Sequence, residues 1–124
     1  MNQKFYICKH CGNVIEKVED KGVPVVCCGE VMKELQAGIE DAAFEKHIPV
    51  YTVEGDTVHV FVGEVEHPME KEHYIMWIAQ VSENRITRVK LHPEQATETR
   101  FPYISGATLY AYCNKHGLWK TTIE

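Results

Sequence analysis

The sequence predicts a mainly β protein in which a small, metal-stapled module precedes an antiparallel β-sandwich. Residues 1–36 contain four cysteines and short apolar patches, too little to bury a stable core without a metal. From Pro49 onward, short runs of β-branched and aromatic residues alternate with turn signals, and no long stretch keeps a helical period. We therefore expect two domains, at 1–36 and 37–124.

The strands of the larger domain are predicted from these short runs. The clearest is 57–62, whose β-branched residues follow the turn signal Glu54-Gly55-Asp56. A polar loop at 63–73 is longer than a tight hairpin needs, which indicates a functional role. A short helical turn is expected at 42–45. The predicted strands are 50–53, 57–62, 74–81, 86–91, 108–113 and 118–123.

Composition and charge narrow the function classes. The hydrophobic fraction of 44% and the charged fraction of 25% are typical of a globular protein in water. The net charge of -5 falls entirely on 37–124, so no nucleic-acid partner is expected. The longest apolar runs are too short to span a membrane, so no membrane partner is expected. An anionic substrate would need a local positive site. The first residues lack a signal-peptide core, so a cytoplasmic location is expected, where closely spaced cysteines remain reduced and bind metals.

Two cysteine pairs predict the first metal site. Two residues separate Cys8 from Cys11, so both sulfurs can face one ion. Gly12 can adopt a positive φ and turn its amide toward a sulfur. Cys27 and Cys28 are adjacent, and neighbouring side chains normally point apart, so we expect a distorted tetrahedron. The ligands suit iron or zinc, and a structural zinc ribbon remains an alternative.

The fifth cysteine, Cys113, predicts a second site of different chemistry. Its Cys-x-x-His spacing to His116 lets both side chains meet one ion across a turn. A thiolate with several imidazoles makes a redox centre rather than a structural clip. Each histidine alone also has an ordinary structural explanation, so the prediction depends on the whole set. Three further histidines lie at strand ends or in loops: His47, His67 and His73.

The remaining histidines are not expected to bind metal. His10 lies inside the first cysteine knuckle, where four thiolates already complete a closed site, so its side chain should face solvent. His59 lies between two valines of a predicted strand and should face solvent too. His92 precedes a proline at a strand end.

Together and in order, these motifs resemble desulfoferrodoxin, the two-iron form of superoxide reductase. The cysteine pairs resemble its desulforedoxin-like module. Four later segments resemble its neelaredoxin-like catalytic domain: Glu45-Lys46-His47-x-Pro49, His67-Pro68-Met69, His73-Tyr74-Ile75 and Cys113-Asn114-x-His116-Gly117-x-Trp119. The resemblance covers nearly the whole chain, and the combined motifs are very specific.

The resemblance implies two iron ions per chain, an immunoglobulin-like sandwich and a homodimer. One iron would be bound by Cys8, Cys11, Cys27 and Cys28. The catalytic iron would have four imidazoles in a plane and a thiolate on the axis, from His47, His67, His73, His116 and Cys113. Its sixth position would be open in the ferrous state. Glu45 would approach that position when the iron is oxidised, and Lys46 would lie over it when substrate arrives.

The implied activity is the one-electron reduction of superoxide to hydrogen peroxide without formation of dioxygen, a detoxification under oxidative stress. A rubredoxin-type carrier would supply the electron. Ferrous iron with one thiolate and neutral imidazoles has a local charge of about +1, which attracts an anion, and Lys46 adds a cation and a proton route. Glu45 could instead be a solvated surface carboxylate.

Three other functions fit parts of the pattern. An electron-transfer protein would use both irons as relays, although five ligands leave a vacancy that such a site usually closes. A zinc-ribbon binding module would make the histidines incidental, which metal analysis tests. A superoxide dismutase would regenerate dioxygen and would consume no reductant.

Overall fold

The computed structural model describes residues 2–38, 47–62 and 69–124, and every regular element within these ranges is a β-strand. None of the described residues forms a helix, so none forms one suited to crossing a membrane. The chain divides into two compact units, Gln3–Gln36 and Asn2 with Ala37–Glu124. The helical turn expected at 42–45 lies outside the described residues.

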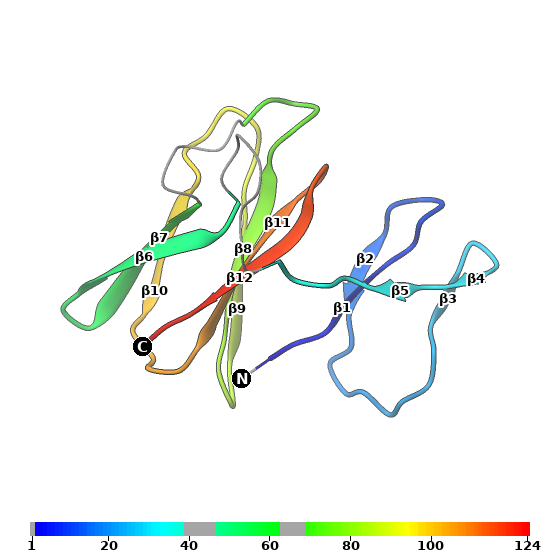
Figure 1. The fold of residues 1–124 in the computed structure, drawn as a ribbon, viewed down its shortest axis with the longest axis horizontal. Helices are drawn as coiled ribbons and strands as arrows, with labels where there is room; N and C mark the ends of the chain where they lie inside the picture. The colour runs from blue at the N-terminus through cyan, green and yellow to red at the C-terminus, as the bar shows by residue number, and fades with distance from the viewer. Residues whose placement is uncertain (1, 39–46, 63–68) are drawn as a thin grey trace. The chain divides into compact units, whose positions relative to one another are not determined.

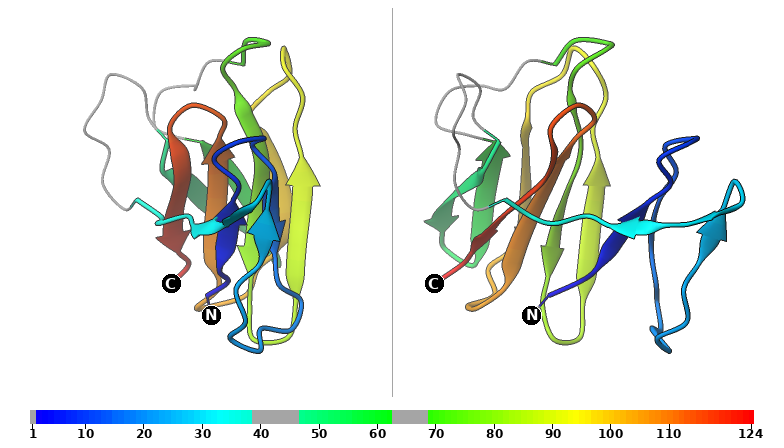
Figure 2. Two further views of the ribbon diagram at one scale, coloured as in Figure 1. Left: turned by 90° about the vertical axis from the view of Figure 1, so that its right-hand side faces the viewer. Right: turned by 45° about the vertical axis from the view of Figure 1, so that its right-hand side comes forward.

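The larger unit contains two antiparallel sheets, which Figures 1 and 2 show as two layers. The first has the order β10-β7-β6, from β6 (Pro49–Glu54), β7 (Thr57–Val62) and β10 (Glu98–Pro102). The second has the order β12-β11-β8-β9, from β8 (Ile75–Val81), β9 (Ile86–Lys90), β11 (Thr108–Cys113) and β12 (Gly117–Thr122). The predicted mainly β fold class with an antiparallel sandwich is confirmed.

Alternating side chains build the core between these sheets. In β7 the valines at 58, 60 and 62 are buried, whereas their neighbours are partly exposed, because successive residues of a strand face opposite sides. In β11 the same alternation sends Leu109, Ala111 and Cys113 into the core cluster. Cys113 is a candidate metal ligand, so the second site lies at the end of β11, at the edge of the core.

The smaller unit has much less to bury. A three-stranded sheet has the order β2-β1-β5, from β1 (Phe5–Ile7), β2 (Val14–Glu16) and β5 (Lys33–Glu34), and β3 (Val26–Cys27) pairs with β4 (Glu30–Val31). Within this unit the buried apolar residues are Phe5, Cys8 and Met32. Several valines, including Val18 and Val23, are exposed. A core of this size does not hold a fold without a staple.

Candidate metal centres

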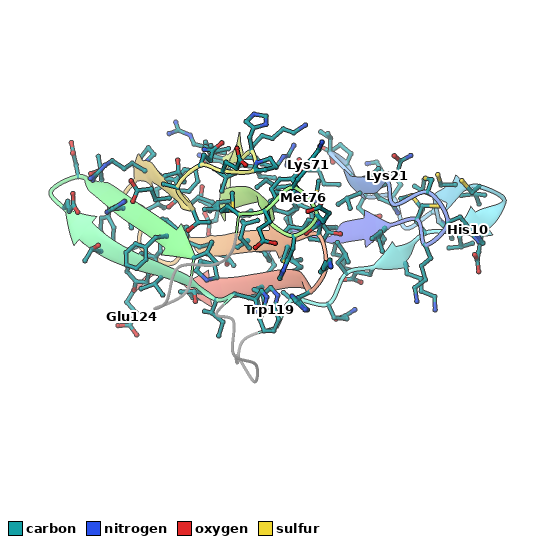
Figure 3. All side chains as sticks on the ribbon, turned by 90° about the horizontal axis from the view of Figure 1, so that it is seen from above. His10, Lys21, Lys71, Met76, Trp119 and Glu124 are labelled. Atoms are coloured by element: carbon teal, nitrogen blue, oxygen red, sulfur yellow. The ribbon has the colours of Figure 1, made fainter. Side chains whose placement is uncertain are left out.

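The four cysteines of the smaller unit converge. Their Sγ atoms all lie within 4.8 Å of one another, and the Sγ atoms of Cys11 and Cys27 are 3.7 Å apart. A tetrahedron with metal–sulfur bonds of about 2.3 Å has edges of about 3.8 Å. In Figure 3 the sulfur atoms gather beside the labelled His10. The donor set therefore fits one four-coordinate ion.

A tight turn forms the first half of this cluster. Gly12 has φ +84°, a conformation that glycine adopts at no steric cost. Its N–H donates to the carbonyl oxygen of Cys8 at 2.9 Å. The expected positive φ is therefore present, but the amide bonds the backbone oxygen. Closing the knuckle in this way brings Cys8 and Cys11 together.

A left-handed backbone conformation at Cys28 lets the side chains of Cys27 and Cys28, which normally would point apart, reach one cluster. Cys28 has φ +53°, which is uncommon for a residue with a Cβ. This conformation turns the chain sharply after Cys27, so two neighbouring side chains reach the same cluster. Strain of this kind costs about 1–3 kcal/mol and persists where surrounding structure or a ligand compensates for it.

The pKa values of the thiols in this cluster shift in opposite directions. Hydrogen bonds from the backbone N–H of Cys11 and then of His10 lower the pKa of the Cys8 thiol to about 6. The sulfurs of Cys11 and Cys8 raise the pKa of Cys28 to about 12 and also raise the pKa of Cys27. At neutral pH Cys8 is therefore the thiolate, and the cluster must lose further protons when a metal binds.

These pKa directions predict a steep pH dependence of metal affinity. Cys27 and Cys28 must each release a proton on binding, whereas Cys8 is already deprotonated above about pH 6. We expect the apparent association constant for zinc to rise at least about 100-fold from pH 7 to pH 8, tenfold per proton. Competition with a chelator of known affinity measures it. Cys28→Ser should reduce the slope, and a pH-independent constant would contradict the assignment.

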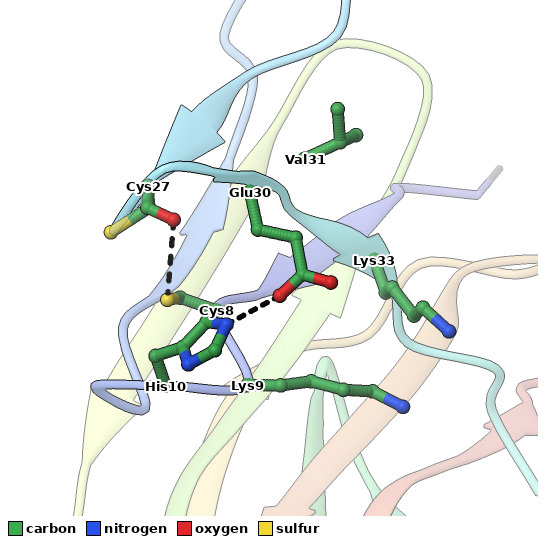
Figure 4. Close-up of a pocket in the computed structure, with 7 residues that line it drawn as sticks. All are labelled: Cys8, Lys9, His10, Cys27, Glu30, Val31 and Lys33. Atoms are coloured by element: carbon green, nitrogen blue, oxygen red, sulfur yellow. Dashed lines mark hydrogen bonds and ion pairs between the residues drawn. The ribbon is translucent and has the colours of Figure 1, made fainter.

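His10 faces solvent, as expected, and takes no part in the sulfur cluster. Its side chain is 58% exposed, and its Nε2 pairs with a carboxylate oxygen of Glu30. This contact joins the first cysteine turn to the start of β4 and lies in a pocket beside the cluster (Figure 4). The pocket is lined by Cys8, Lys9, His10, Cys27, Glu30, Val31 and Lys33.

A second cluster lies in the larger unit. One ligand atom each from His47, His73, Cys113 and His116 lies within 4.8 Å of all the others. His47 Nε2 and His116 Nδ1 are 3.1 Å apart, and Cys113 Sγ is 3.8 Å from His116 Nδ1. Two ligands of one ion cannot be farther apart than their summed bond lengths, about 4.2 Å for two imidazoles and about 4.4 Å for thiolate and imidazole. Both distances satisfy this limit, so His47, Cys113 and His116 can share one ion, and the donor atom of His73 lies within 4.8 Å of each of theirs.

Strand ends and turns bring the four residues together. Cys113 ends β11 and pairs with Gly117 at the start of β12, so His116 belongs to the three-residue turn between them. His47 lies two residues before β6 in the other sheet and is 1% exposed. His73 lies two residues before β8. Three segments far apart in the sequence thus meet at one end of the sandwich.

A β-bulge lies beside Cys113. Tyr112 pairs with Trp77, but Cys113 pairs with Ile75, so Met76 is an extra residue in β8. Bulges often occur next to active sites, where they redirect side chains. Here Tyr112 stacks on Trp77 at 5.6 Å, whereas Ile75 and Cys113 both join the core. The bulge therefore places Ile75 on the core face, opposite Cys113, which the regular alternation of β11 already directs inward.

Three predicted site residues lie outside the described ranges: Glu45, Lys46 and His67. The structure therefore brings together three of the four predicted histidines with the predicted cysteine. His59 has a different setting, because its ring nitrogens approach the carboxylates of Glu54 and Glu98 at 3.7 and 3.3 Å. It lies on the outward face of β7, which agrees with its exclusion from the site.

Asn114 holds two segments of the second cluster together, a role that the sequence did not reveal. Its Oδ1 accepts from the N–H of Tyr74 at 3.0 Å, and its Nδ2 donates to the carbonyl oxygen of Glu72 at 2.9 Å. These two hydrogen bonds hold the backbone of the residues before and after His73. The signal in the sequence was the position of Asn114 directly after the cysteine.

We expect Asn114→Ala to weaken metal binding at the second cluster by about 10–100-fold, the usual effect of losing a group that orients a ligand. The change removes both side-chain bonds of Asn114 to the His73 segment. Chelator competition at the Cys113 centre measures the loss. Asn84→Ala is the matched control, because Asn84 is exposed in the turn between β8 and β9. Equal affinities in the two variants would contradict this role.

A sandwich with a buried cysteine among histidines, in a chain whose other unit has a four-cysteine cluster, defines a metalloprotein with two distinct sites. Residues 39–122 match the family model described as desulfoferrodoxin. A desulfoferrodoxin of Clostridium acetobutylicum is 41% identical over 119 residues, 96% of this chain and 95% of that protein. The chain belongs to the desulfoferrodoxin family.

Solved structures agree with this. The superoxide reductase from Treponema pallidum aligns with a TM-score of 0.78 at 32% identity, covering 97% of this chain and 98% of that one. A superoxide reductase from Giardia intestinalis, described as 1Fe-SOR, aligns with a TM-score of 0.58 at 28% identity, covering 64% of this chain and 98% of that one. In a chain of this family, the two clusters are consistent with two iron sites.

Proposed function

We propose that this protein is a superoxide reductase, which reduces superoxide by one electron to hydrogen peroxide and forms no dioxygen. The observation that carries this proposal is the cluster of the buried Cys113 with His47, His73 and His116. A thiolate with imidazoles is a donor set for redox chemistry. The structurally similar proteins from Treponema pallidum and Giardia intestinalis bear the name superoxide reductase, which supports the assignment.

The catalytic centre of the proposal has five ligands. They are His47, His67, His73, His116 and Cys113, of which His67 lies outside the described residues. Ferrous iron held there would supply the electron. Cys113 is 0% exposed, so its sulfur is shielded from water and its negative charge acts at close range in a low dielectric. One thiolate and neutral imidazoles leave a net positive charge, which attracts an anion to a protein of net charge -5.

Glu45 and Lys46 complete the proposed site, next to His47 in the sequence. The ammonium of Lys46 would attract superoxide and donate a hydrogen bond and a proton to it. The carboxylate of Glu45 would help displace the peroxide product and protect the oxidised site.

We expect Lys46→Ala to lower the bimolecular rate with superoxide by about tenfold at low ionic strength, because steering charges raise association rates by 10-fold or more. The difference should shrink as salt screens the charge. Pulse radiolysis at several salt concentrations measures both effects. Lys90→Ala is the control, because it removes the same charge from an exposed position on β9. If the two variants behaved alike at low salt, Lys46 would have no steering role.

The two units have separate roles in this proposal. Residues 1–36 form the four-cysteine iron module, and 37–124 form the catalytic domain. Cys11 and Cys28 are exposed, which supports a relay role, since an electron carrier can approach their sulfurs. A rubredoxin-type donor would reduce the protein, which would act as a homodimer in the cytoplasm.

The test is an anaerobic pulse of superoxide onto the fully ferrous protein. Stoichiometric peroxide, no evolved dioxygen and a new thiolate-to-ferric absorption band are the expected results. Dioxygen in equal amount to peroxide would indicate a dismutase instead. No reaction from an iron-loaded protein would favour an electron carrier and would overturn the proposal.

A further inference from the structure

We propose that Trp119 is a positioning residue for the Cys113 centre and that the close approach of Gly38 fixes the Trp119 ring. The proposal rests on the proposed function in one respect, because it takes the second cluster as the working iron site. Its evidence is the contact of one indole ring with two of the candidate ligands and with the backbone of Gly38.

Trp119 contacts both His47 and His116. Its ring stacks on the His47 imidazole with centroids 4.8 Å apart and planes 14° apart. Its Nε1–H donates to the carbonyl oxygen of His116 at 3.1 Å. One rigid side chain thus restrains the ring plane of one ligand and the backbone of another.

The stack of Trp119 on His47 determines the orientation of the His47 imidazole. Its Nε2 lies 3.1 Å from His116 Nδ1, so a rotation of the imidazole plane changes the geometry that both nitrogens offer to an ion. His47 precedes β6, whereas His116 belongs to the turn before β12, so the two come from different sheets. Trp119 is the described side chain that bonds or stacks on both. Loss of a group that orients a ligand typically costs 10–100-fold in metal affinity.

Gly38 lies against the Trp119 ring and is held there by backbone hydrogen bonds to β12. Its N–H donates to the carbonyl of Leu118 at 2.9 Å, and its carbonyl accepts from the N–H of Lys120 at 3.0 Å. These two bonds place Gly38 directly beside Trp119. A Cβ at Gly38 would lie 2.7 Å from both Cε3 and Cζ3 of the indole, closer than real carbon contacts allow. Glycine is required here for space, since the backbone must approach the ring closely.

It follows that a methyl group at residue 38 would act on the iron site through Trp119. Both hydrogen bonds to β12 hold the Gly38 backbone in place, so the ring must shift. A shifted ring loses its stack on His47. Gly38 therefore influences a ligand that is nine residues away in the sequence and that it does not bond.

The experiment uses the full, iron-loaded chain with four variants: Gly38→Ala, Trp119→Leu, Trp119→Phe, and Gly38→Ala with Trp119→Phe. Oxidised protein is mixed with a chelator, and iron loss is followed separately in the thiolate-to-ferric band of the Cys113 centre and in the four-cysteine absorption. We expect Gly38→Ala and Trp119→Leu to speed iron loss from the Cys113 centre by about 10–100-fold. We also expect both to shift its band, with the four-cysteine absorption unchanged.

The two phenylalanine variants test the route through the ring. Phenylalanine keeps an aromatic face for His47 but lacks the part of the indole that carries Cε3 and Cζ3, the atoms that a Cβ at residue 38 would meet. Adding Gly38→Ala to Trp119→Phe should therefore have little further effect. Interacting residues show such non-additivity in a double-mutant cycle.

Gly55→Ala is the matched control. Gly55 has φ +68° in the turn between β6 and β7, and nothing lies within 4 Å of an added Cβ, so its substitution strains the backbone without touching the site. Iron loss in Gly38→Ala no faster than in Gly55→Ala, or an unchanged band in Trp119→Leu, would overturn the proposal. Neither result depends on superoxide. If wild-type protein failed to reduce superoxide while these variants still altered the band, the positioning role would stand and the proposed function would fall.

Discussion

Cys113→Ser is expected to abolish the thiolate-to-ferric absorption band and to reduce the rate of superoxide reduction by more than about 100-fold, beyond the usual effect of losing a supporting group. Serine has nearly the shape of cysteine, but its hydroxyl remains protonated at neutral pH and cannot replace a thiolate ligand. Cys113 is 0% exposed and packs in the core cluster with Leu109 and Ala111. The variant should therefore fold while its centre loses its charged ligand.

The same substitution at the other cluster is the control. Cys28→Ser removes one of the four thiols of the smaller unit and leaves the Cys113 centre intact. It should keep the ferric band and its reaction with a superoxide pulse. Stopped-flow absorption and peroxide yield distinguish the two variants. A Cys113→Ser protein that retained both band and rate would remove this residue from the catalytic centre.

Removal of the four-cysteine metal is expected to unfold the smaller unit while the sandwich remains folded. Structural zinc contributes apparent folding energies of about 10–16 kcal/mol in small fingers, and such modules unfold without metal. In the unit Gln3–Gln36 the buried apolar residues are Phe5, Cys8 and Met32, so little else opposes the loss of chain entropy. The left-handed Cys28 also loses the ligand that compensates for its strain.

Amide hydrogen exchange measures this prediction strand by strand. Protection should vanish in β1, whose residues pair with both β2 and β5, when a chelator removes the metal. Protection should persist in β7 and β11, which lie in the other unit and contribute many of its buried side chains. Undiminished protection in β1 of the metal-free protein would show that the fold of the smaller unit does not depend on the ion.

Local patterns were enough to predict most strands of the sandwich. The run Thr57–Val62 was predicted as it occurs in β7, because β-branched residues alternate between a buried and an open face. The strand ending at Cys113 was also predicted correctly, and its ligand spacing to His116 reflects a turn that is local in the sequence. Features that depend on a few neighbouring residues can be predicted from those residues.

Other features depend on contacts between distant segments and were not predicted. The strand β10 was not predicted, because Phe101 is its single buried residue and the strand also contains Glu98, Arg100 and Pro102. It forms because β7 pairs with it along its whole length. The stack of Trp119 on His47 brings together β12 and the chain just before β6, which belong to different sheets. The left-handed φ of Cys28 allows two adjacent cysteines to reach the same cluster. Neither is encoded in a short pattern.

The extra residue at Met76, labelled in Figure 3, changes the phase of β8. Positions 75 and 77 would share one face of an uninterrupted strand, yet Ile75 lies in the core and Trp77 stacks on Tyr112. The chain before the bulge, which carries His73, is thus out of step by one residue with the chain after it. If Met76 instead paired with Cys113 in a regular ladder, Ile75 and the residues before it would move by one position, about 3.3 Å, and would face the other side of the sheet. A single backbone irregularity therefore determines which face of the sandwich receives this histidine.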